Sequence, residues 1–199
     1  MKQRIVKHRL TDEDFCVLIR DDQKADLIDG VIYMASPQSL PENEFLGWLM
    51  GLVWEFVSEK DLGQVYFQRV AYRLGPHDMP EPDLAFVCKE RQHLARSNYF
   101  DGPPDLAIEL VTPDSVERDY DMKRKQYQTA KVREYWIIDE AIEEVTLLQL
   151  QSKGEFLQAE PRGGRLDSIV LPGFYLRPEW LWQSPFPKVV PILARLLNP

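Results

Sequence analysis

Short apolar runs and amphipathic stretches alternate along the chain and predict a fold that mixes helices with strands. Capping residues or helical spacing of apolar residues predict helices over residues 11–20, 42–58 and 115–131, with a polar helical insert at 89–100 and a terminal helix near 191–197. Apolar, aromatic or β-branched runs predict a hairpin over 24–37 with its turn at Asp29-Gly30, and strands over 64–74, 83–88, 105–111, 134–139 and 144–150. This order favours an α/β domain of the mixed α+β kind, with further short strands in the tail.

Length and composition are those of an ordinary globular protein. The 199 residues suit one domain with elaborations, and 44% of them are hydrophobic and 28% charged. No apolar run reaches the roughly 20 residues that a membrane span needs, so we expect no membrane partner. The basic N-terminus has no apolar stretch behind it, which argues against a signal peptide, and two isolated cysteines favour a reducing cytoplasm. The net charge of −8 excludes a protein that coats nucleic acid with its whole surface.

Two acidic residues lie in the apolar strands 83–88 and 105–111. Strand alternation places Asp83, Ala85 and Val87 on one face of the first strand. In the second, Glu109 is the only charge in the middle of the strand, and a buried charge is costly unless it is paired or binds a metal. Asp83 could simply cap its strand, and Glu109 could form a buried ion pair with an arginine. Together, carboxylates on adjacent strands can hold Mg²⁺ or Mn²⁺, which prefer oxygen ligands.

The helix over 115–131 adds a lysine to these acids. Steps of four and three residues predict one stripe that faces the sheet, made of Val116, Tyr120, Lys123, Tyr127 and Ala130. Lys123 is the only charged residue of the stripe, so it could orient an attacking water or steady charge on a phosphate. The alternative is a lysine that extends to solvent from the helix edge. Lys125 lies about 200° away around the helix and is predicted to face solvent.

The same helix is locally basic. Between residues 116 and 133 six basic residues stand against three acidic ones, although the whole chain is acidic. We expect Arg118, Arg124 and Lys125 to contact the phosphates of a nucleic acid. A solvated helix face with ion pairs between neighbouring turns would give the same pattern.

Three segments carry a family resemblance: EPDLAFV, then GPPDLAIELVTPDSVERDYDMKRKQY, then VREYWIID. They resemble the Uma-type putative restriction endonuclease family of bacteria, which is part of the PD-(D/E)XK nuclease superfamily. The resemblance implies a restriction-endonuclease-like core, a central mixed sheet flanked by helices, over about residues 22–140. Residues 1–21 would be an N-terminal extension and residues 141–199 a β-rich C-terminal elaboration.

The resemblance also implies roles for residues. Asp83 and Glu109 match the two metal-binding acids, but Val111 stands where the motif has its lysine. Relatives with this gap carry the lysine on the next helix, where Lys123 stands, with Tyr127 to support it. Some members use an acid on the first core helix, so Glu44 or Glu42 is a candidate auxiliary ligand.

These roles imply hydrolysis of phosphodiester bonds, with DNA as the expected substrate, Mg²⁺ or Mn²⁺ as cofactor, and a homodimer by analogy with enzymes that cut both strands. Two other readings stay open. The fold could have lost catalysis and act as a binding or assembly module, or Glu109 and Lys123 could form a structural ion pair in a domain of unrelated function.

Overall fold

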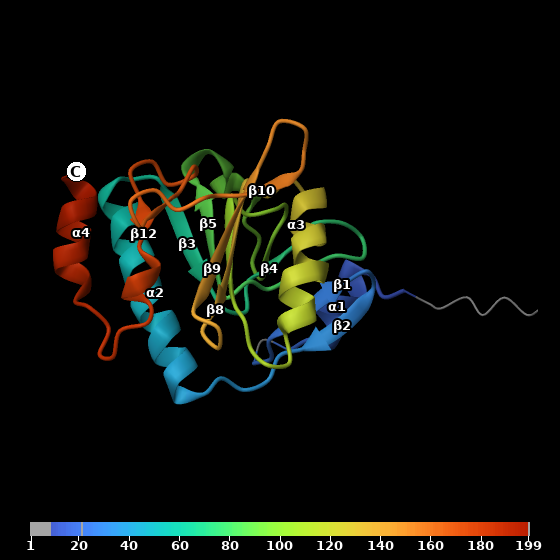
Figure 1. Ribbon diagram of the computed structural model, residues 1–199. Helices are drawn as coiled ribbons and strands as arrows, with labels where there is room; N and C mark the ends of the chain where they lie inside the picture. The colour runs from blue at the N-terminus through green and yellow to red at the C-terminus, as the bar shows by residue number, and fades with distance from the viewer. Residues whose placement is uncertain (1–8, 21, 199) are drawn as a thin grey trace, which may run out of the picture.

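A six-stranded mixed sheet forms the centre of the computed structural model, which describes residues 9–20 and 22–198 (Figure 1). In spatial order its strands are β10 (Phe156–Gln158), β9 (Glu144–Leu150), β8 (Glu134–Asp139), β7 (Leu106–Leu110), β5 (Leu84–Cys88) and β3 (Gly63–Phe67). Only β7 and β8 run parallel, and all other neighbours are antiparallel. The predicted mixed sheet with its β8–β9 pair is confirmed. Residues 1–8, on which the prediction of no signal peptide and part of the N-terminal extension rest, lie outside the described residues.

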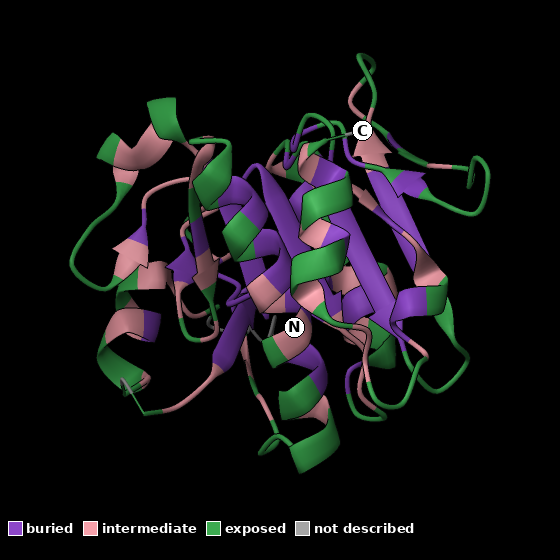
Figure 2. Ribbon diagram, turned by 90° about the vertical axis from the view of Figure 1, so that its left-hand side faces the viewer, coloured by how far each residue is buried: buried purple, intermediate pink, exposed green. Residues whose placement is uncertain are grey.

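Helices cover both faces of this sheet. The long helix α2 (Leu40–Glu59) and the terminal helix α4 (Val189–Leu197) lie on one side, and α3 (Arg124–Thr129) lies on the other (Figure 1). Ser39 caps α2 with its side chain, which explains why the helix begins before the predicted residue 42. Purple strands behind the helices in Figure 2 show that the sheet is buried between these layers.

Alternate residues of the central strands belong to different cores, as the sequence predicts. Leu84 and Ile108 pack in the cluster that includes the apolar face of α2. Ala107 packs instead with Tyr127 and Ile137 on the side of α3. Glu109 has the same orientation as Ala107, because residues two apart on a strand share a face. The carboxylate of Glu109 therefore points toward α3.

The N-terminal elements pack beside α3, outside the central sheet. Thr11 caps α1 (Asp12–Leu18), and the hairpin of β1 (Ala25–Ile28) and β2 (Val31–Met34) follows. Positive φ angles at Asp29 (50°) and Gly30 (75°) produce the tight turn that the sequence predicts. The side chain of Gln126 donates a hydrogen bond of 2.9 Å to the backbone oxygen of Leu27, which ties the hairpin to α3.

The segment 64–74, predicted as one strand, is two. β3 ends at Phe67, and β4 (Ala71–Tyr72) leaves the central sheet to pair with β6 (Tyr99–Phe100). Between them Gln68 and Arg69 have positive φ angles of 43° and 51°. The prediction was wrong because composition does not reveal this local turn, which no glycine or proline marks. The polar insert predicted as helical over residues 89–100 is helical only in part: it begins with a 3₁₀ helix, η1 (Lys89–Leu94), and ends in the strand β6.

The helix predicted over 115–131 begins as a π-helix. This segment, η2 (Arg118–Lys123), continues directly into α3. A π-turn holds more residues than an α-turn, so positions before it do not keep the predicted α-helical phase. The predicted inward position of Val116 is wrong: this side chain is 47% exposed, and Asp119 is buried instead. Lys123 and Tyr127 are buried as predicted, and Lys125 is exposed.

Beyond β9 and β10, which lie in the central sheet, the described tail adds one short strand pair and two helical segments. Strands β11 (Leu166–Asp167) and β12 (Tyr175–Leu176) pair antiparallel, and the 3₁₀ helix η3 (Pro178–Trp180) leads toward α4. Trp180 packs in the core on the α2 side of the sheet. None of the helices in the described ranges has the length and apolar character needed to cross a bilayer.

Candidate active site

The two predicted acids lie side by side on neighbouring strands. Leu84 of β5 is the register partner of Ile108 of β7, so the next positions along these antiparallel strands are Asp83 and Glu109. The backbone N–H of Leu110 donates a hydrogen bond of 2.8 Å to Oδ2 of Asp83. Both carboxylates are buried, with exposures of 6% for Asp83 and 1% for Glu109. The fold therefore brings together the pair that the sequence singles out.

Lys123 reaches these acids from η2. Its Nζ lies 2.9 Å from Oε1 of Glu109, 3.0 Å from Oδ2 of Asp26 and 3.7 Å from Oδ1 of Asp119. The lysine side chain is 2% exposed, so it does not extend to solvent from the helix edge. An ammonium has three hydrogens to donate, and three carboxylates surround this one.

Tyr127 contacts an acid and not the lysine. Its hydroxyl donates a hydrogen bond of 2.8 Å to Oε1 of Glu109. The sequence predicts that Tyr127 supports Lys123 directly. In the structure the two side chains are linked through Glu109, whose Oε1 accepts from both. Tyr127 and Lys123 together fix the position of Glu109.

Sequence reasoning missed three charged residues of this cluster: Lys24, Asp26 and Asp119. The ammonium of Lys24 forms an ion pair with Oδ1 of Asp83. Asp26 was detectable, because it is the only charge in β1, whose four residues are all buried. Lys24 and Asp119 carry no comparable signal, since each looks like a solvated residue in its local sequence.

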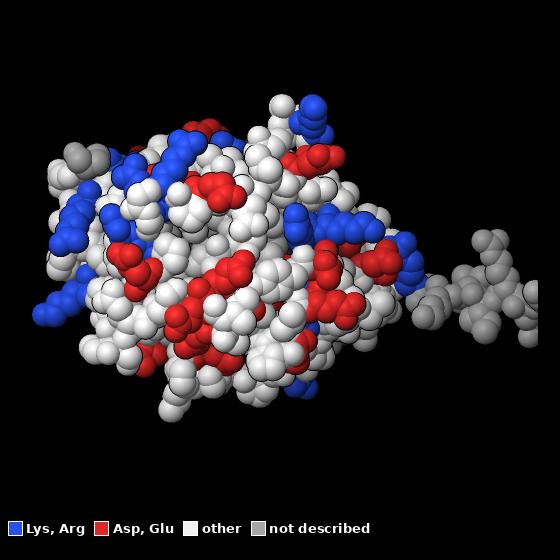
Figure 3. Space-filling view, viewed as in Figure 1, with Lys and Arg blue, Asp and Glu red and all other residues white. Residues whose placement is uncertain are grey.

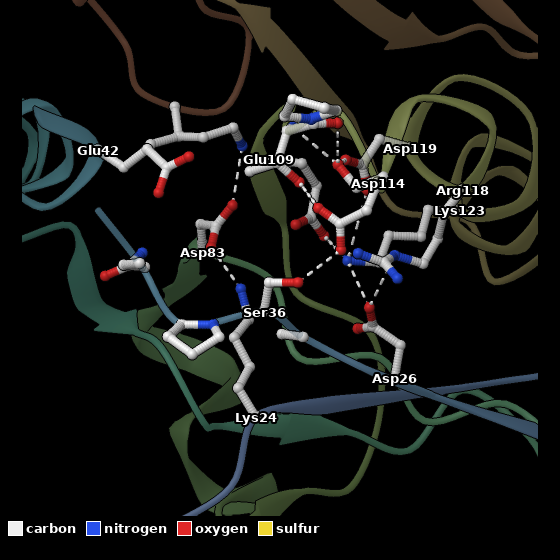
Figure 4. A pocket seen from close by; sticks show the side chains of 17 residues that line it. Lys24, Asp26, Ser36, Glu42, Asp83, Glu109, Asp114, Arg118, Asp119 and Lys123 are labelled. Carbon is white, nitrogen blue, oxygen red and sulfur yellow. Dashed lines mark hydrogen bonds and ion pairs between the residues drawn. The ribbon is translucent and has the colours of Figure 1, made fainter.

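These groups line a cavity of about 110 Å³ (Figure 4). Six acids line it (Asp26, Glu42, Asp83, Glu109, Asp114 and Asp119), against three bases (Lys24, Arg118 and Lys123). In the labelled view, Lys24 reaches Asp83 from one side while Asp26, Arg118 and Lys123 meet on the other. With all nine groups ionised the lining carries a charge of −3, so the cavity attracts cations.

The other predicted residues divide between this cavity and the surface. Glu42 lines the cavity, and its carboxylate also caps α2 by accepting from Ser39 N at 2.7 Å. Glu44 is exposed and does not line the cavity, because it lies two residues farther along the helix and points elsewhere. Arg118 lines the cavity and its Nε lies 3.5 Å from Oδ2 of Asp26. Arg124 and Lys125, in contrast, are exposed outside it.

Burial and neighbouring charges set the protonation of the acid pair. Burial alone raises the pKa of Asp83, but the ammonium groups of Lys24 and Lys123 more than offset it, so the pKa of Asp83 lies below its ordinary value. Burial raises the pKa of Glu109 to about 8. The positive charge of Lys123 lowers this pKa, and the negative charge of Asp83 raises it further. The two acids therefore differ in protonation. At a pH between their two pKa values Asp83 is ionised, while Glu109 still holds its proton.

Glu81 is a further buried acid next to the cluster. It is 4% exposed and accepts a hydrogen bond of 3.2 Å from Ala25 N. Burial raises the pKa of Glu81 to about 7, and the carboxylate of Asp26 acts in the same direction. In the unfolded chain this group titrates near 4.5, so the folded state binds more protons between these values.

We therefore expect Glu81 to make the protein less stable as pH rises. Its contribution is fully present below pH 4.5 and is lost as pH rises through about 7, with an upper limit of about 3 kcal/mol. In Glu81→Gln the fall in melting temperature between pH 5 and pH 8 should be smaller than in the wild type. Glu179→Gln, a change at an exposed side chain, should leave the pH profile as it is, and an unchanged profile in Glu81→Gln would contradict the prediction.

A comparison with known families decides where this chain belongs. Residues 12–179 match the Uma2 family, whose description is "putative restriction endonuclease". The chain belongs to the Uma2 family. The match includes every charged residue of the cavity, so the cluster lies inside the part of the chain that defines Uma2 membership.

Among solved structures, the Uma2 chain is similar to a protein from Anabaena variabilis ATCC 29413, described as a putative nuclease belonging to DUF820. The two share 15% sequence identity with a TM-score of 0.73, over 87% of this chain and 97% of the other. At this identity the likeness shows a shared fold, and it confirms the nuclease-like architecture that the sequence predicts. No curated protein matches the chain.

Proposed function

We propose that this protein is a metal-dependent endonuclease that hydrolyses phosphodiester bonds, with DNA as its substrate. The observation that carries the proposal is the meeting of Asp83 and Glu109, from adjacent strands, in one acidic cavity. Membership of a family of putative nucleases supports the reaction class. Neither DNA nor Mg²⁺ follows from that membership alone, so both are part of the proposal.

The donor set of the cavity fits Mg²⁺ or Mn²⁺. Mg²⁺ is commonly bound by one or two carboxylates together with water and substrate phosphate oxygens. Asp83 and Glu109 supply two such carboxylates, and within residues 9–20 and 22–198 no group of three or more His, Cys, Asp or Glu side chains forms a complete protein cage. A site built on this pair would therefore be completed by water in the free protein and by phosphate oxygens once the substrate is bound. When bound, the ion would polarise the phosphate and activate water for attack.

The chain's own residues have separate tasks in this proposal. Lys123 and Tyr127 hold Glu109 in place through Oε1, which leaves Oε2 for another partner. Lys123 was expected to orient the attacking water, but three carboxylates surround its ammonium. We assign it instead to positioning Glu109 and Asp26. Lys24 and Lys123 keep the pKa of Asp83 low, so Asp83 is ready to bind a cation, whereas Glu109 would release its proton when the cation binds.

Charge predicts the order of binding. The lining is acidic whether or not Glu109 holds its proton, and it repels a phosphodiester, so DNA enters this cavity only with a cation bound. On the face shown in Figure 3, acidic side chains gather near the middle and basic ones lie mostly toward the edges. Arg118 at the cavity, and Arg124 and Lys125 on the exposed side of the helix, remain the proposed phosphate contacts. A homodimer, which would supply two sites for a duplex, also remains a proposal.

A second candidate function is a nuclease fold without catalysis that binds nucleic acid or assembles with a partner. Two observations favour it. Val111 occupies the lysine position of the motif, and both Asp83 and Glu109 already form ion pairs with lysines. The pair Glu109–Lys123 is the structural ion pair that the sequence left open, and its presence is compatible with either function.

Incubation of the purified protein with supercoiled plasmid tests the proposal. We expect nicked and linear products in Mn²⁺ or Mg²⁺ and none in EDTA, because the acid pair cannot approach phosphate without a cation. Asp83→Asn should remove the products while the melting temperature without metal stays high, since asparagine still accepts from Leu110 N. DNA binding without cleavage, in every metal tried, would favour the inactive module.

A further inference from the structure

The two lysines of the cavity differ in how tightly they are held. Lys123 has three carboxylate neighbours and is 2% exposed, whereas Lys24 makes one ion pair, with Asp83, and its side chain is 20% exposed. Lys24 also stands just before β1, outside any helix or strand. A side chain with one contact and access to solvent can move, and one enclosed by three counter-ions cannot.

Lys24 lies between two cavities. Besides the acidic cavity it lines a larger one of about 380 Å³, together with Arg69, Gln38 and Gln68. Among the described residues that line this second cavity, Asp22 is the only acid, and it pairs with Arg20. The larger cavity thus has room for the lysine to turn into, and fewer acids are found among its described lining residues than around the acidic cavity.

The contact of Lys24 with Asp83 is also the one that a cation must replace. Oδ2 of Asp83 accepts from the backbone of Leu110, while Oδ1 faces the ammonium of Lys24, as Figure 4 shows. A divalent ion and an ammonium at the same oxygen repel each other strongly at such distances, even in a partly aqueous site. Binding of the ion therefore releases the lysine.

We propose that Lys24 is an exchangeable cation: its ammonium neutralises Asp83 before the metal binds, and then turns to a phosphate of the bound DNA. The inference rests on the proposed function, and it gives Lys24 the phosphate-binding task that the enclosed Lys123 cannot perform. Lys24 is thus a competitor of the metal in the free protein and a ligand of the substrate in the complex.

Titration of the full-length protein with MnCl₂ in a calorimeter tests the first half. Lys24→Met should bind Mn²⁺ about tenfold more tightly than the wild type, because the competing charge is gone. Lys24→Arg should restore the weaker affinity. Lys89→Met is the matched control: Lys89 also pairs with an aspartate, Asp61, but lies at the opposite end of β5 from Asp83. It should bind Mn²⁺ as the wild type does.

Fluorescence anisotropy with a labelled 30-base-pair duplex tests the second half. In Ca²⁺ we expect Lys24→Met to bind the duplex several-fold more weakly than Lys89→Met, and in EDTA we expect no difference between them. The role of Lys24 is overturned if Lys24→Met binds Mn²⁺ with the same affinity as the wild type, or if it loses as much DNA affinity without Ca²⁺ as with it. Neither result contradicts the proposed function. Failure of both proteins to bind Mn²⁺ overturns the proposed function as well.

Discussion

Lys123→Met is expected to lower the free energy of unfolding by about 3–5 kcal/mol at neutral pH, the range found when one partner of a buried ion pair is removed. Lys123 is the common cation of Asp26, Glu109 and Asp119, all of them buried. Without the ammonium these carboxylates repel one another in a site with little water. Methionine keeps most of the volume of the lysine side chain, so the loss of stability measures the removal of the charge and not the opening of a cavity.

Urea denaturation at several pH values measures this effect. Lys123 lowers the pKa of Glu109 and of Asp119, so in its absence these acids take up protons at higher pH and the variant should recover stability as pH falls. Lys125→Met, two residues along the same helix and exposed, should change stability by less than about 0.5 kcal/mol. A loss below about 1 kcal/mol in Lys123→Met would show that the cluster does not need its central cation.

Glu109→Gln is expected to reduce cleavage by about a thousandfold, which corresponds to about 4 kcal/mol of transition-state stabilisation. Glutamine has a similar shape and can still accept from Tyr127 and Lys123, but it is a poor ligand for a divalent ion. Because burial raises the pKa of Glu109, a neutral side chain here removes a cost of folding, so the variant should remain folded.

Glu134→Gln is the matched control for this change. Glu134 lies in β8, the parallel neighbour of β7, and is also fully buried, but its carboxylate accepts from Trp136 and Ile169 and does not line the acidic cavity. Initial rates on plasmid DNA in Mn²⁺ should be near wild type for Glu134→Gln. Equal rates for the two variants, whether both low or both high, would contradict a metal-binding role for Glu109.

Much of the fold could be predicted because its signals are local. Alternation in β5 and β7 fixes which side chains face α2 and which face α3, and the Thr11 cap marks the start of α1. The break at Gln68 and Arg69 and the π-helix at Arg118–Lys123 could not be predicted. Both are backbone conformations that tertiary packing selects against the preferences of the residues.

The candidate site was predictable in part for the same reason. Asp83, Glu109 and Lys123 each stand out against apolar neighbours, and the structure brings them into one cavity. Lys24 joins them through a contact with a residue 59 positions away, and nothing in its local sequence indicates that.

The hairpin of β1 and β2 links the site to folding in a way that the central sheet does not. It carries Asp26 yet pairs with no strand of that sheet, and it is held by contacts such as Lys123 to Asp26 and Glu81 N to Asp26 Oδ1, at 2.9 Å. If the hairpin opens while the sheet stays intact, Lys123 loses one of its three counter-ions and gains access to water. The hairpin and the charge cluster should therefore open as one cooperative unit, at a free energy below that of global unfolding.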